Sequence, residues 1–448
     1  MSNGSTLMTE GPVWKHIVKF AVPVLWGNLF QQLYNVVDTL VVGNCLGSDA
    51  LAAVGSSGNI IFLLVGLFSG LFTGAGAVIS GYFGARDQES MSKAIHTTVA
   101  FGLAAGLALS VAGVFLSPVL LRWIGTPESV FPKSVEYFRI YFSGVIFVVL
   151  YNTAAGIFQT VGDSRHPLYF LIVSSVVNVV LDLVFVAGLG MDVGGAALAT
   201  VISQAVSAGL GFHRLFTTDD VYRVWPKKIR FHGKMLRRLL VMGIPAGLQN
   251  SIISIGNIFV QSGINRYDAM AVAGSGAYSK IEGFGFLPVN AFIMALTVFT
   301  AQNLGAKEMD RVKKGTRFGI ISCMVMAEII ALLVYALAPL LIGLFNGEAE
   351  VVRMGTIHAR TVTPFFFLLA FSHSVAAILR GAGKAIVPMV VMALCWCVVR
   401  ILYISFVTPM FDTIRAVFMV YPITWTLSSI VFLVYYLKGN WKNSSLTA

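Results

Sequence analysis

Charged residues are scarce in this chain. Asp, Glu, Lys and Arg make up 11% of its 448 residues, against about 25% in a soluble globular domain. Hydrophobic residues make up 57%, and the mean hydropathy is +0.81. This composition excludes an ordinary soluble fold and is typical of a polytopic helical membrane protein.

Metal-binding and catalytic patterns are also missing. The sequence has four cysteines, and Cys395 and Cys397 lie two residues apart on an apolar segment, where helical side chains do not face each other. No His or Cys lies near them to complete a ligand set. The seven His are scattered, and neither HExxH nor GxSxG occurs. We therefore expect no structural metal, no cofactor and no enzyme.

A nucleotide-binding loop is absent as well. Gly381-Ala-Gly383-Lys384 has a superficial similarity to the pattern GxxxxGK[ST], but the first glycine of that pattern would fall on Ile378. Ala385 stands where the pattern requires Ser or Thr. Without an ATP-binding domain, any uphill transport must be coupled to an ion gradient.

Twelve apolar segments are long enough to cross a bilayer, which takes about 20 residues. Lipid offers the backbone no hydrogen-bond partners, and the alternation typical of a β-barrel is absent, so the segments must be helices. The sequence predicts an all-α polytopic membrane protein with twelve transmembrane helices. The segments are roughly 16–43, 52–82, 94–117, 134–158, 167–189, 194–216, 236–264, 271–302, 316–345, 355–379, 386–410 and 414–437.

The net charge of +11 is distributed unevenly over the loops. With twelve spans, one set of loops holds about 22 of the 31 basic residues, including the run from Arg214 to Arg238. The positive-inside rule places this set in the cytoplasm, which predicts a multi-pass protein of the plasma (inner) membrane with both termini cytoplasmic. The charge therefore does not indicate a nucleic-acid partner. Residues 1–15 are polar and show no cleavable signal pattern.

An internal repeat of about 220 residues divides the chain. Six spans per copy preserve the orientation, so the copies are parallel repeats related by a pseudo-two-fold axis along the membrane normal. We predict an N-lobe of six helices over residues 1–216, a cytoplasmic linker over 217–235 and a C-lobe of six helices over 236–448. The matching positions include Pro23 with Pro245, Asn35 with Asn257, Gly84-Ala85-Arg86-Asp87 with Gly305-Ala306-Lys307-Glu308, and Gly162 with Gly383.

Two acids of the first copy lie inside apolar segments. Asp182 is surrounded by Leu, Val and Phe, and Asn178 lies four residues earlier on the same helical face. Asp38 follows Asn35 by three residues, and Thr200 lies early in the next segment. A carboxylate in a spanning helix costs at least ~2.5 kcal/mol. Each acid therefore requires a partner, a proton or an ion.

Their positions along their helices allow these five residues to converge at one depth of the membrane. The oxygens of Asp38, Asn178, Asp182 and Thr200 suit Na⁺, and two close carboxylates can instead share a proton. A purely structural hydrogen-bond cluster that locks the helices together is the alternative. If the cluster binds Na⁺ or shares a proton, it is a cation or proton coupling site.

The second copy lacks this acid pair, because its aligned residues are Val260 and Tyr403. Glu328 and Arg400 of that copy both fall near the middle of the membrane, so we expect a salt bridge between their helices. The membrane charges of the second copy are Lys280, Glu282, Glu328 and Arg400.

Pro23 and Pro245 lie inside the first helix of each copy. Proline removes one backbone hydrogen bond and bends a helix. The bend is either a passive kink or a bending point during transport, and Pro23 is the candidate for the second role.

Five stretches of the chain form a further pattern: FAVPVLWGNLFQQLYNVVDTLVVG (20–43), GARD (84–87), NVVLD (178–182), AQNLGA (301–306) and LRGAGK (379–384). Together they make the chain similar, over its whole length, to the multidrug and toxic compound extrusion (MATE) family. The resemblance implies two six-helix lobes around a central cavity and cation-coupled export of amphipathic, often cationic drugs.

The resemblance also implies a coupling site. The N-lobe site of the archaeal and DinF-like branch falls here on Asp38, Asn178, Asp182 and Thr200, and a tyrosine near that site matches Tyr137. The acids that the NorM-like branch uses in its seventh and tenth helices have no clear counterpart. The chain is therefore closest to the DinF-like or archaeal branch.

These observations predict an antiporter driven by H⁺ or Na⁺ that exports small hydrophobic cations and works as a monomer. The alternative within the same superfamily is a flippase for a lipid-linked precursor. Such a protein requires a more basic cavity, because the precursor carries a pyrophosphate. A receptor or scaffold has no reason to keep two unpaired carboxylates in the membrane. We expect the substrate cavity to be lined by Gln31, Tyr34, Phe158, Asn257, Gln261, Tyr278 and Met294.

Overall fold

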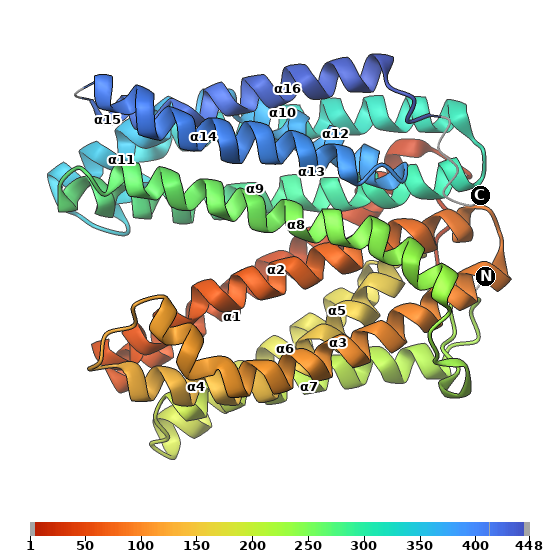
Figure 1. Ribbon diagram of the computed structural model, residues 1–448, viewed down its shortest axis with the longest axis horizontal. Helices are drawn as coiled ribbons and strands as arrows, with labels where there is room; N and C mark the ends of the chain where they lie inside the picture. Colours follow the sequence, from red (N-terminus) through yellow and green to blue (C-terminus); the bar gives the residue numbers. More distant parts are fainter. Residues whose placement is uncertain (1–4, 412, 443–448) are drawn as a thin grey trace. The chain divides into compact units, whose positions relative to one another are not determined.

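The computed structural model describes residues 5–411 and 413–442, which are almost entirely helical. Twelve helical runs follow one another in the described part of the chain (Figure 1). The runs are α1 (Val13–Leu46); α2 (Ser48–Gly84); α3 (Gln88–Trp123); α4 (Phe131–Ser143) with α5 (Val145–Thr160); α6 (Arg165–Asp182) with η1 (Leu183–Gly188); α7 (Val193–Thr217); α8 (Gly233–Ile264); α9 (Ala269–Gly305); α10 (Met309–Gly343); α11 (Ala349–Val362) with η3 (Thr363–Phe365) and α12 (Phe366–Gly381); α13 (Ile386–Met392) with η4 (Ala393–Val398), α14 (Val399–Leu402), η5 (Tyr403–Val407) and η6 (Thr408–Met410); and α15 (Ile414–Phe418) with α16 (Val420–Lys438).

The lengths of these runs fit a bilayer. Within the described residues, 10 helices are long and apolar enough to cross a membrane, and α4 with α5, bent by 44°, makes an eleventh candidate. The remaining run, α1, has 34 residues and carries several amides and Asp38 among its apolar residues. The prediction of an all-α, multi-pass membrane protein is confirmed.

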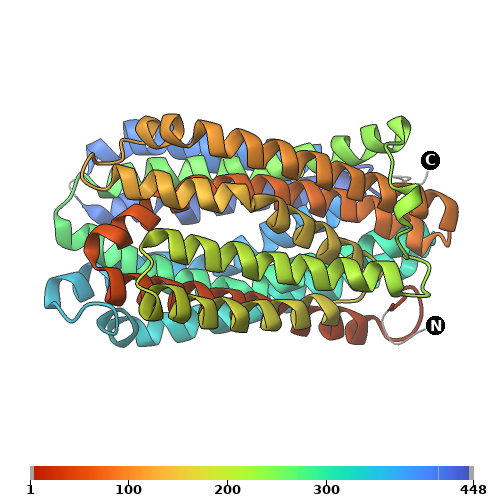
Figure 2. The same cartoon turned by 90° about the horizontal axis from the view of Figure 1, so that it is seen from below.

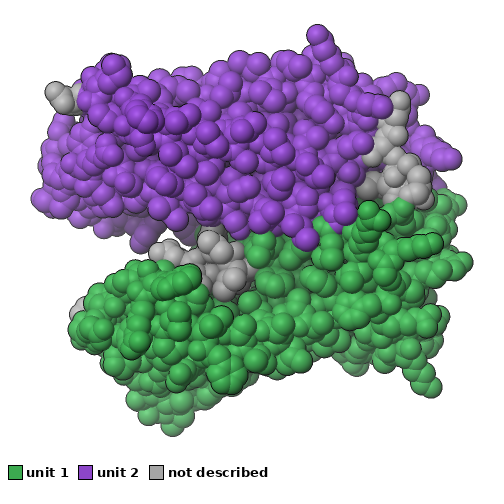
Figure 3. Space-filling model, viewed as in Figure 1, with its two compact units in different colours: residues 1–7, 26–240 green, residues 8–25, 241–448 purple. Residues whose placement is uncertain are grey.

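The chain forms two compact units. Unit 1 consists of Met1–Leu7 with Trp26–Leu240, and unit 2 of Met8–Leu25 with Val241–Ala448 (Figure 3). The helices α1 and α8 each pass from one unit to the other within their own length. The sequence predicted a first lobe over 1–216 that contains all of α1, a linker over 217–235, and a second lobe that begins at residue 236, inside α8.

Hydrogen bonds explain why the segment Met8–Leu25 belongs to unit 2. The backbone N–H of Met8 donates to Oε1 of Gln302 at 2.9 Å. Arg311 donates from Nη1 to the carbonyl of Gly11 at 2.7 Å. These bonds fix the segment before α1 to the corner between α9 and α10.

The corners of the two units repeat each other in conformation. Arg86 and Lys307 have φ angles of 57° and 61°, and Gly162 and Gly383 have φ angles of 80° and 79°. These are matching positions of the internal repeat. A positive φ is uncommon outside glycine, so its recurrence at Arg86 and Lys307 shows that both copies build the same corner.

Each unit has its own packed interior. In unit 1, α3 packs against α4 and α5, and α7 packs against α5 and α6 (Figure 2). In unit 2, α9 packs against α10, α11 and α12, and α16 packs against α12. Unit 1 encloses Phe138, Phe142 and Phe158, while Tyr278 and Trp425 are enclosed in unit 2.

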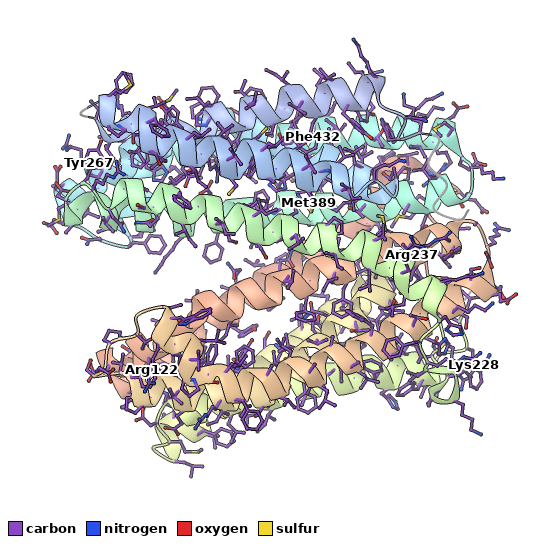
Figure 4. The ribbon with its side chains drawn as sticks, viewed as in Figure 1. Arg122, Lys228, Arg237, Tyr267, Met389 and Phe432 are labelled. Carbon is purple, nitrogen blue, oxygen red and sulfur yellow. The ribbon has the colours of Figure 1, made fainter. Side chains whose placement is uncertain are left out.

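The long basic loop between α7 and α8 lies at one end of unit 1. Lys228 and Arg237 mark this end in Figure 4, and Arg122 lies at the opposite end of the unit. The loop is held in place by Tyr222, which is buried against Phe158 with ring centroids 5.7 Å apart. The short turn η2 (Pro226–Lys228) follows.

Candidate functional site

Asp182 lies where the α-helical hydrogen-bond pattern of its span stops. α6 ends at this residue, and the same run continues as the π-helical turn η1. Such turns are rare and occur often at functional sites. Asp182 is 0% exposed and Asn178, one turn earlier, is 1% exposed. The span thus presents a carboxyl and an amide to the interior of unit 1.

These buried groups have no ordinary partners. Both carboxyl oxygens of Asp182 and both polar side-chain atoms of Asn178 lack a hydrogen-bond partner within the described part of the chain. One oxygen of Asp38 on α1 is in the same situation. An unpartnered buried polar group costs about 1–3 kcal/mol, and more when it is charged. The fold therefore keeps three costly groups that packing alone does not require.

The structure brings Asp38 and Asp182 together. The two carboxyl groups lie within hydrogen-bonding reach of each other. Ionised carboxylates only accept hydrogen bonds, so a bond between them needs a proton on one of the two. Without that proton, two negative charges face each other at close range and require a bound cation.

α1 is held beside the elements that carry the other site residues. A Cβ at Gly27 would lie 3.4 Å from Leu171 of α6, which is ordinary van der Waals contact. Further along α1, Val41 and Val42 share a buried cluster with Tyr137 of α4. The position of Asp38 is therefore set by packing on both sides of it.

Two tyrosines surround the acid pair. Tyr34, one turn before Asp38, has Gln31 and Gln204 as neighbours and lies in electrostatic range of both acids. Tyr137 is buried, lies in electrostatic range of both acids, and stacks on Tyr141 with centroids 6.3 Å apart. Tyr137 and Tyr34 thus both lie close to the acid pair.

Two predicted members are not joined to the pair by a hydrogen bond. Thr200 donates from Oγ1 to the carbonyl of Ala196 in its own helix at 3.1 Å, a common way for threonine to satisfy its hydroxyl. Asn35 is exposed and donates from Nδ2 to Oε1 of Gln32 at 3.4 Å. In this structure the Asn35 amide and the Thr200 hydroxyl each form a hydrogen bond within their own helix.

Gln204 is a site residue that the sequence analysis missed. It lies on α7 one turn after Thr200, is 7% exposed, and its Oε1 has no partner among the described residues. Its side chain reaches Tyr34. The spacing of four residues from Thr200 is the signal that would have found it.

The residues predicted to line a substrate cavity have different environments. Gln31 and Tyr34 belong to unit 1 and are at least partly exposed, as are Asn257, Gln261 and Met294 in unit 2. Phe158 and Tyr278 are 0% exposed. Both rings are enclosed in the interiors of their units and touch no open space in this conformation. Pro23 lies inside an unbroken α1.

The predicted salt bridge between Glu328 and Arg400 is wrong. Glu328 accepts a hydrogen bond from the backbone N–H of Phe367 at 3.2 Å, near the start of α12. Arg400 donates from Nη1 to Oδ1 of Asn257 at 2.5 Å. Each group is hydrogen-bonded to a neutral partner instead. The depth of a residue in the membrane can be judged from the sequence, but it does not say which helices are neighbours.

A transition-metal site has no support in the described residues, where no group of three or more His, Cys, Asp or Glu comes together. The oxygens of Asp38, Asp182 and Asn178 form a small, hard donor set. That chemistry suits a proton or an alkali cation. Cys395 and Cys397 are free thiols.

Comparisons with known proteins agree with the resemblance noted in the sequence. A family model described as MatE matches residues 23–184 and, a second time, residues 245–405. The two matches occupy the two halves in which the internal repeat was found.

Among curated proteins, the chain is 30% identical to the probable multidrug resistance protein YoeA of Bacillus subtilis, over 97% of this chain and 96% of that protein. It is 28% identical to the probable multidrug resistance protein YpnP of the same organism, over 98% of both chains. The multidrug export protein MepA of Staphylococcus aureus is 22% identical, with 84% and 83% covered.

A solved structure described as MATE in the bent conformation has the same fold. The TM-score is 0.92, the sequence identity is 24%, and the match covers 100% of both chains. This likeness concerns the fold alone.

Proposed function

The chain belongs to the MatE family of membrane transporters, and on that premise we propose that it is a cation-coupled antiporter that exports amphipathic, often cationic organic compounds. Membership of this family makes it a transporter and not an enzyme. The relatives named as multidrug resistance and export proteins support the class of substrate. The protein works in the plasma membrane with both termini cytoplasmic.

The single observation that carries the proposal is the acid pair of unit 1. Asp38 and Asp182 lie within hydrogen-bonding reach of each other, with the unpartnered amide of Asn178 one turn away. Two carboxylates this close resist double ionisation, so the pair holds a proton or a cation. Releasing that charge changes the free energy of the site by several kcal/mol, which is enough to drive a change of conformation.

Coupling requires that cation and drug prefer different states of the protein. In the proposed cycle, the pair is empty while drug is bound, and a cation entering from outside displaces the drug. The bending point is Pro23, which removes one backbone hydrogen bond from α1. Its place supports this role, because α1 passes from unit 2 to unit 1 after Leu25. A bend there moves the half of α1 that carries Asp38.

The site also supports the finer assignment to the DinF-like branch. Unit 1 holds the acid pair, Asn178 and Tyr137, whereas unit 2 has Val260 and Tyr403 at the positions of the acids. Coupling therefore resides in unit 1. Gln31 and Tyr34 on one unit, and Asn257, Gln261 and Met294 on the other, are the residues proposed to contact substrate.

The test is export of a fluorescent cation from pump-deficient bacteria, followed by transport in proteoliposomes. Asp38→Asn and Asp182→Asn preserve shape and remove the charge, so both should reduce export to the background of empty cells. The control is Asp219→Asn, which changes an acid with a 95% exposed side chain in the basic loop. Export by either site variant at the wild-type rate would reject the coupling site.

Imposed gradients then identify the ion. A proton gradient that drives uptake without Na⁺ assigns H⁺, and a Na⁺ gradient at equal pH assigns Na⁺. A wild-type protein that responds to neither gradient across a broad panel of organic cations would overturn the antiporter itself.

A further inference from the structure

Arg400 is a charged group at membrane depth that the coupling site does not use. It lies on α14 between the π-helical turns η4 and η5, and it is 1% exposed. Among the described residues it forms no salt bridge. A buried charge in a spanning helix is costly and is usually functional.

The contacts of the guanidinium are all neutral. Nη1 donates to Oδ1 of Asn257, and Nε lies 3.5 Å from Oγ1 of Thr424. The charge faces the rings of Trp396 and Tyr421, whose centroids are 5.0 Å and 4.9 Å away. These groups fix the orientation of the guanidinium, because they hold it from several sides, but they do not neutralise it.

The nearest acid does not neutralise it by contact either. Glu282 of α9 lies in electrostatic range of Arg400. It makes no hydrogen bond or ion pair with Arg400 among the described residues. The positive charge therefore remains available to a further negative group.

One edge of the guanidinium is also available. Arginine carries five N–H donors in a fixed plane, and no described residue accepts a hydrogen bond from Nη2 of Arg400. The amide that covers Nη1 belongs to Asn257, which is exposed on α8. Asn257 is thus the one exposed residue among the hydrogen-bond partners of the guanidinium, since Thr424 is buried.

We infer that Arg400 is an anion subsite that binds the carboxylate of zwitterionic substrates, with Oδ1 of Asn257 occupying the place of one carboxylate oxygen in this conformation. The inference rests on the proposed export function and extends its substrate class to molecules with a carboxylate beside their positive charge. A guanidinium offers a carboxylate two parallel N–H groups. The rings of Trp396 and Tyr421 hold the guanidinium in place for this contact.

A purely structural arginine that locks α8 against α14 uses the same contacts. The two roles differ in what they do to transport. A lock acts on every substrate alike, because it acts through the fold. An anion subsite acts only on substrates that carry the carboxylate, so the ratio between two matched substrates separates the roles.

Rhodamine 110 and its methyl ester rhodamine 123 form such a pair, because they share the ring system and differ in the free carboxylate. The full-length protein is reconstituted in proteoliposomes, and export of both dyes is measured. In Arg400→Gln the rate ratio of rhodamine 110 to rhodamine 123 should fall about tenfold, the value of one charge-assisted hydrogen bond. Arg400→Lys should retain part of the ratio, since lysine keeps the positive charge but lacks the two parallel N–H groups of the guanidinium.

A second variant avoids removing the arginine. Asn257→Asp supplies an internal carboxylate to the guanidinium, which should pair with it and lower the same ratio about tenfold. The matched control is Asn346→Asp, which makes the same change at an exposed position after α10 and should leave the ratio at the wild-type value.

Equal losses for both dyes in Arg400→Gln and Asn257→Asp would show a structural arginine and overturn the subsite. Export of rhodamine 123 without rhodamine 110 by the wild type would also overturn it, while leaving the proposed function intact. If the wild type exports neither dye, the proposed function fails for these cations. Fluorescence polarisation of each dye with the purified protein then decides the subsite by the same ratio.

Discussion

The two units treat the contact between their first and fifth spans in opposite ways. In unit 1, α1 and α6 meet through the acids Asp38 and Asp182, and one carboxyl oxygen of Asp38 and both of Asp182 lack ordinary partners among the described residues. In unit 2, the corresponding α8 and α14 meet through Asn257 and Arg400, which are hydrogen-bonded to each other. One contact is poised to take up a positive charge, and the other already contains one.

Packing differs at the same place. Tyr34 of α1 has Gly256 as its counterpart on α8. A Cβ at Gly256 would lie 2.0 Å from the carbonyl oxygen of Trp396, so the backbones there approach as closely as glycine allows. Unit 1 instead keeps a tyrosine that reaches Gln204 and borders the acids. The comparison teaches that duplication preserved the helices and their corners but not the chemistry at their contact.

The most direct way to break the comparison is to give unit 1 the residue of unit 2. Asp38→Val should lower gradient-driven export about 100-fold, near the upper end of usual coupling free energies. The thermal unfolding temperature should stay equal or rise, because a costly buried carboxyl is removed. Proteoliposome transport and a melting curve measure the two effects. A variant that both melts early and transports poorly would point to a structural role for Asp38.

Adding a side chain at the close backbone contact of Gly256 should lower the stability of unit 2. Gly256→Ala forces α8 away from Trp396 and should lower the free energy of unfolding by about 1–3 kcal/mol, as expected for overpacking. Gly276→Ala on α9 is the control, since no atom lies within 4 Å of the position a Cβ would take there. Melting curves of the purified variants in one detergent give the comparison. Equal stability of the two variants would contradict the tight contact.

Asn178 offers a sharper test of the coupling site proposed in unit 1. The repeat places a valine, Val399, at the matching position of unit 2. Asn178→Val should weaken cation affinity about tenfold through loss of one oxygen ligand, and should raise stability by about 1 kcal/mol because an unpartnered amide is removed. Ion-dependent transport and melting curves measure the two changes. Lower affinity together with lower stability would mean that the amide holds helices together.

The smallest expected effect concerns the corners of the repeat. Asp87 accepts a hydrogen bond from the N–H of Ser90 at 3.0 Å and caps α3, whereas Glu308 makes no side-chain cap at the start of α10. Asp87→Ala should therefore cost about 1 kcal/mol, and Glu308→Ala close to nothing. Denaturation of both variants gives the values. A larger loss at Glu308 would contradict the geometry.

The same cap predicts a dependence on pH. The hydrogen bonds from the backbone and side chain of Ser90 lower the pKa of Asp87 below its ordinary value. A group with a lowered folded-state pKa stabilises the fold above its unfolded pKa, and this contribution disappears as the pH falls through the folded pKa. The difference between wild type and Asp87→Ala should therefore persist at neutral pH, begin to shrink below about pH 4, and vanish once the pH lies below the lowered pKa of Asp87 in the folded protein.

Some features of the site could be predicted from the sequence because they follow from the free energy needed to place a charged group in the membrane. A carboxylate in an apolar run is expensive wherever the helix goes, so Asp38 and Asp182 were identifiable without coordinates. Gln204 was not, because an amide on a spanning helix carries a weaker signal and its value depends on reaching Tyr34. The partner of Arg400 was predicted wrongly for a related reason. The sequence indicates how deep Arg400 lies in the membrane, but not which helix lies next to it.

The sequence by itself determined the class of the protein, its twelve helical runs and its internal repeat, since the length of an apolar run is set by the thickness of the bilayer. Only the tertiary structure decided which polar groups meet. It also decided that α1 and α8 divide between the units, because a helix continues through its own hydrogen bonds while packing determines what each half touches. The meeting of Asp38 with Asp182, and of Asn257 with Arg400, joins residues more than 140 positions apart, and no local pattern encodes such a contact.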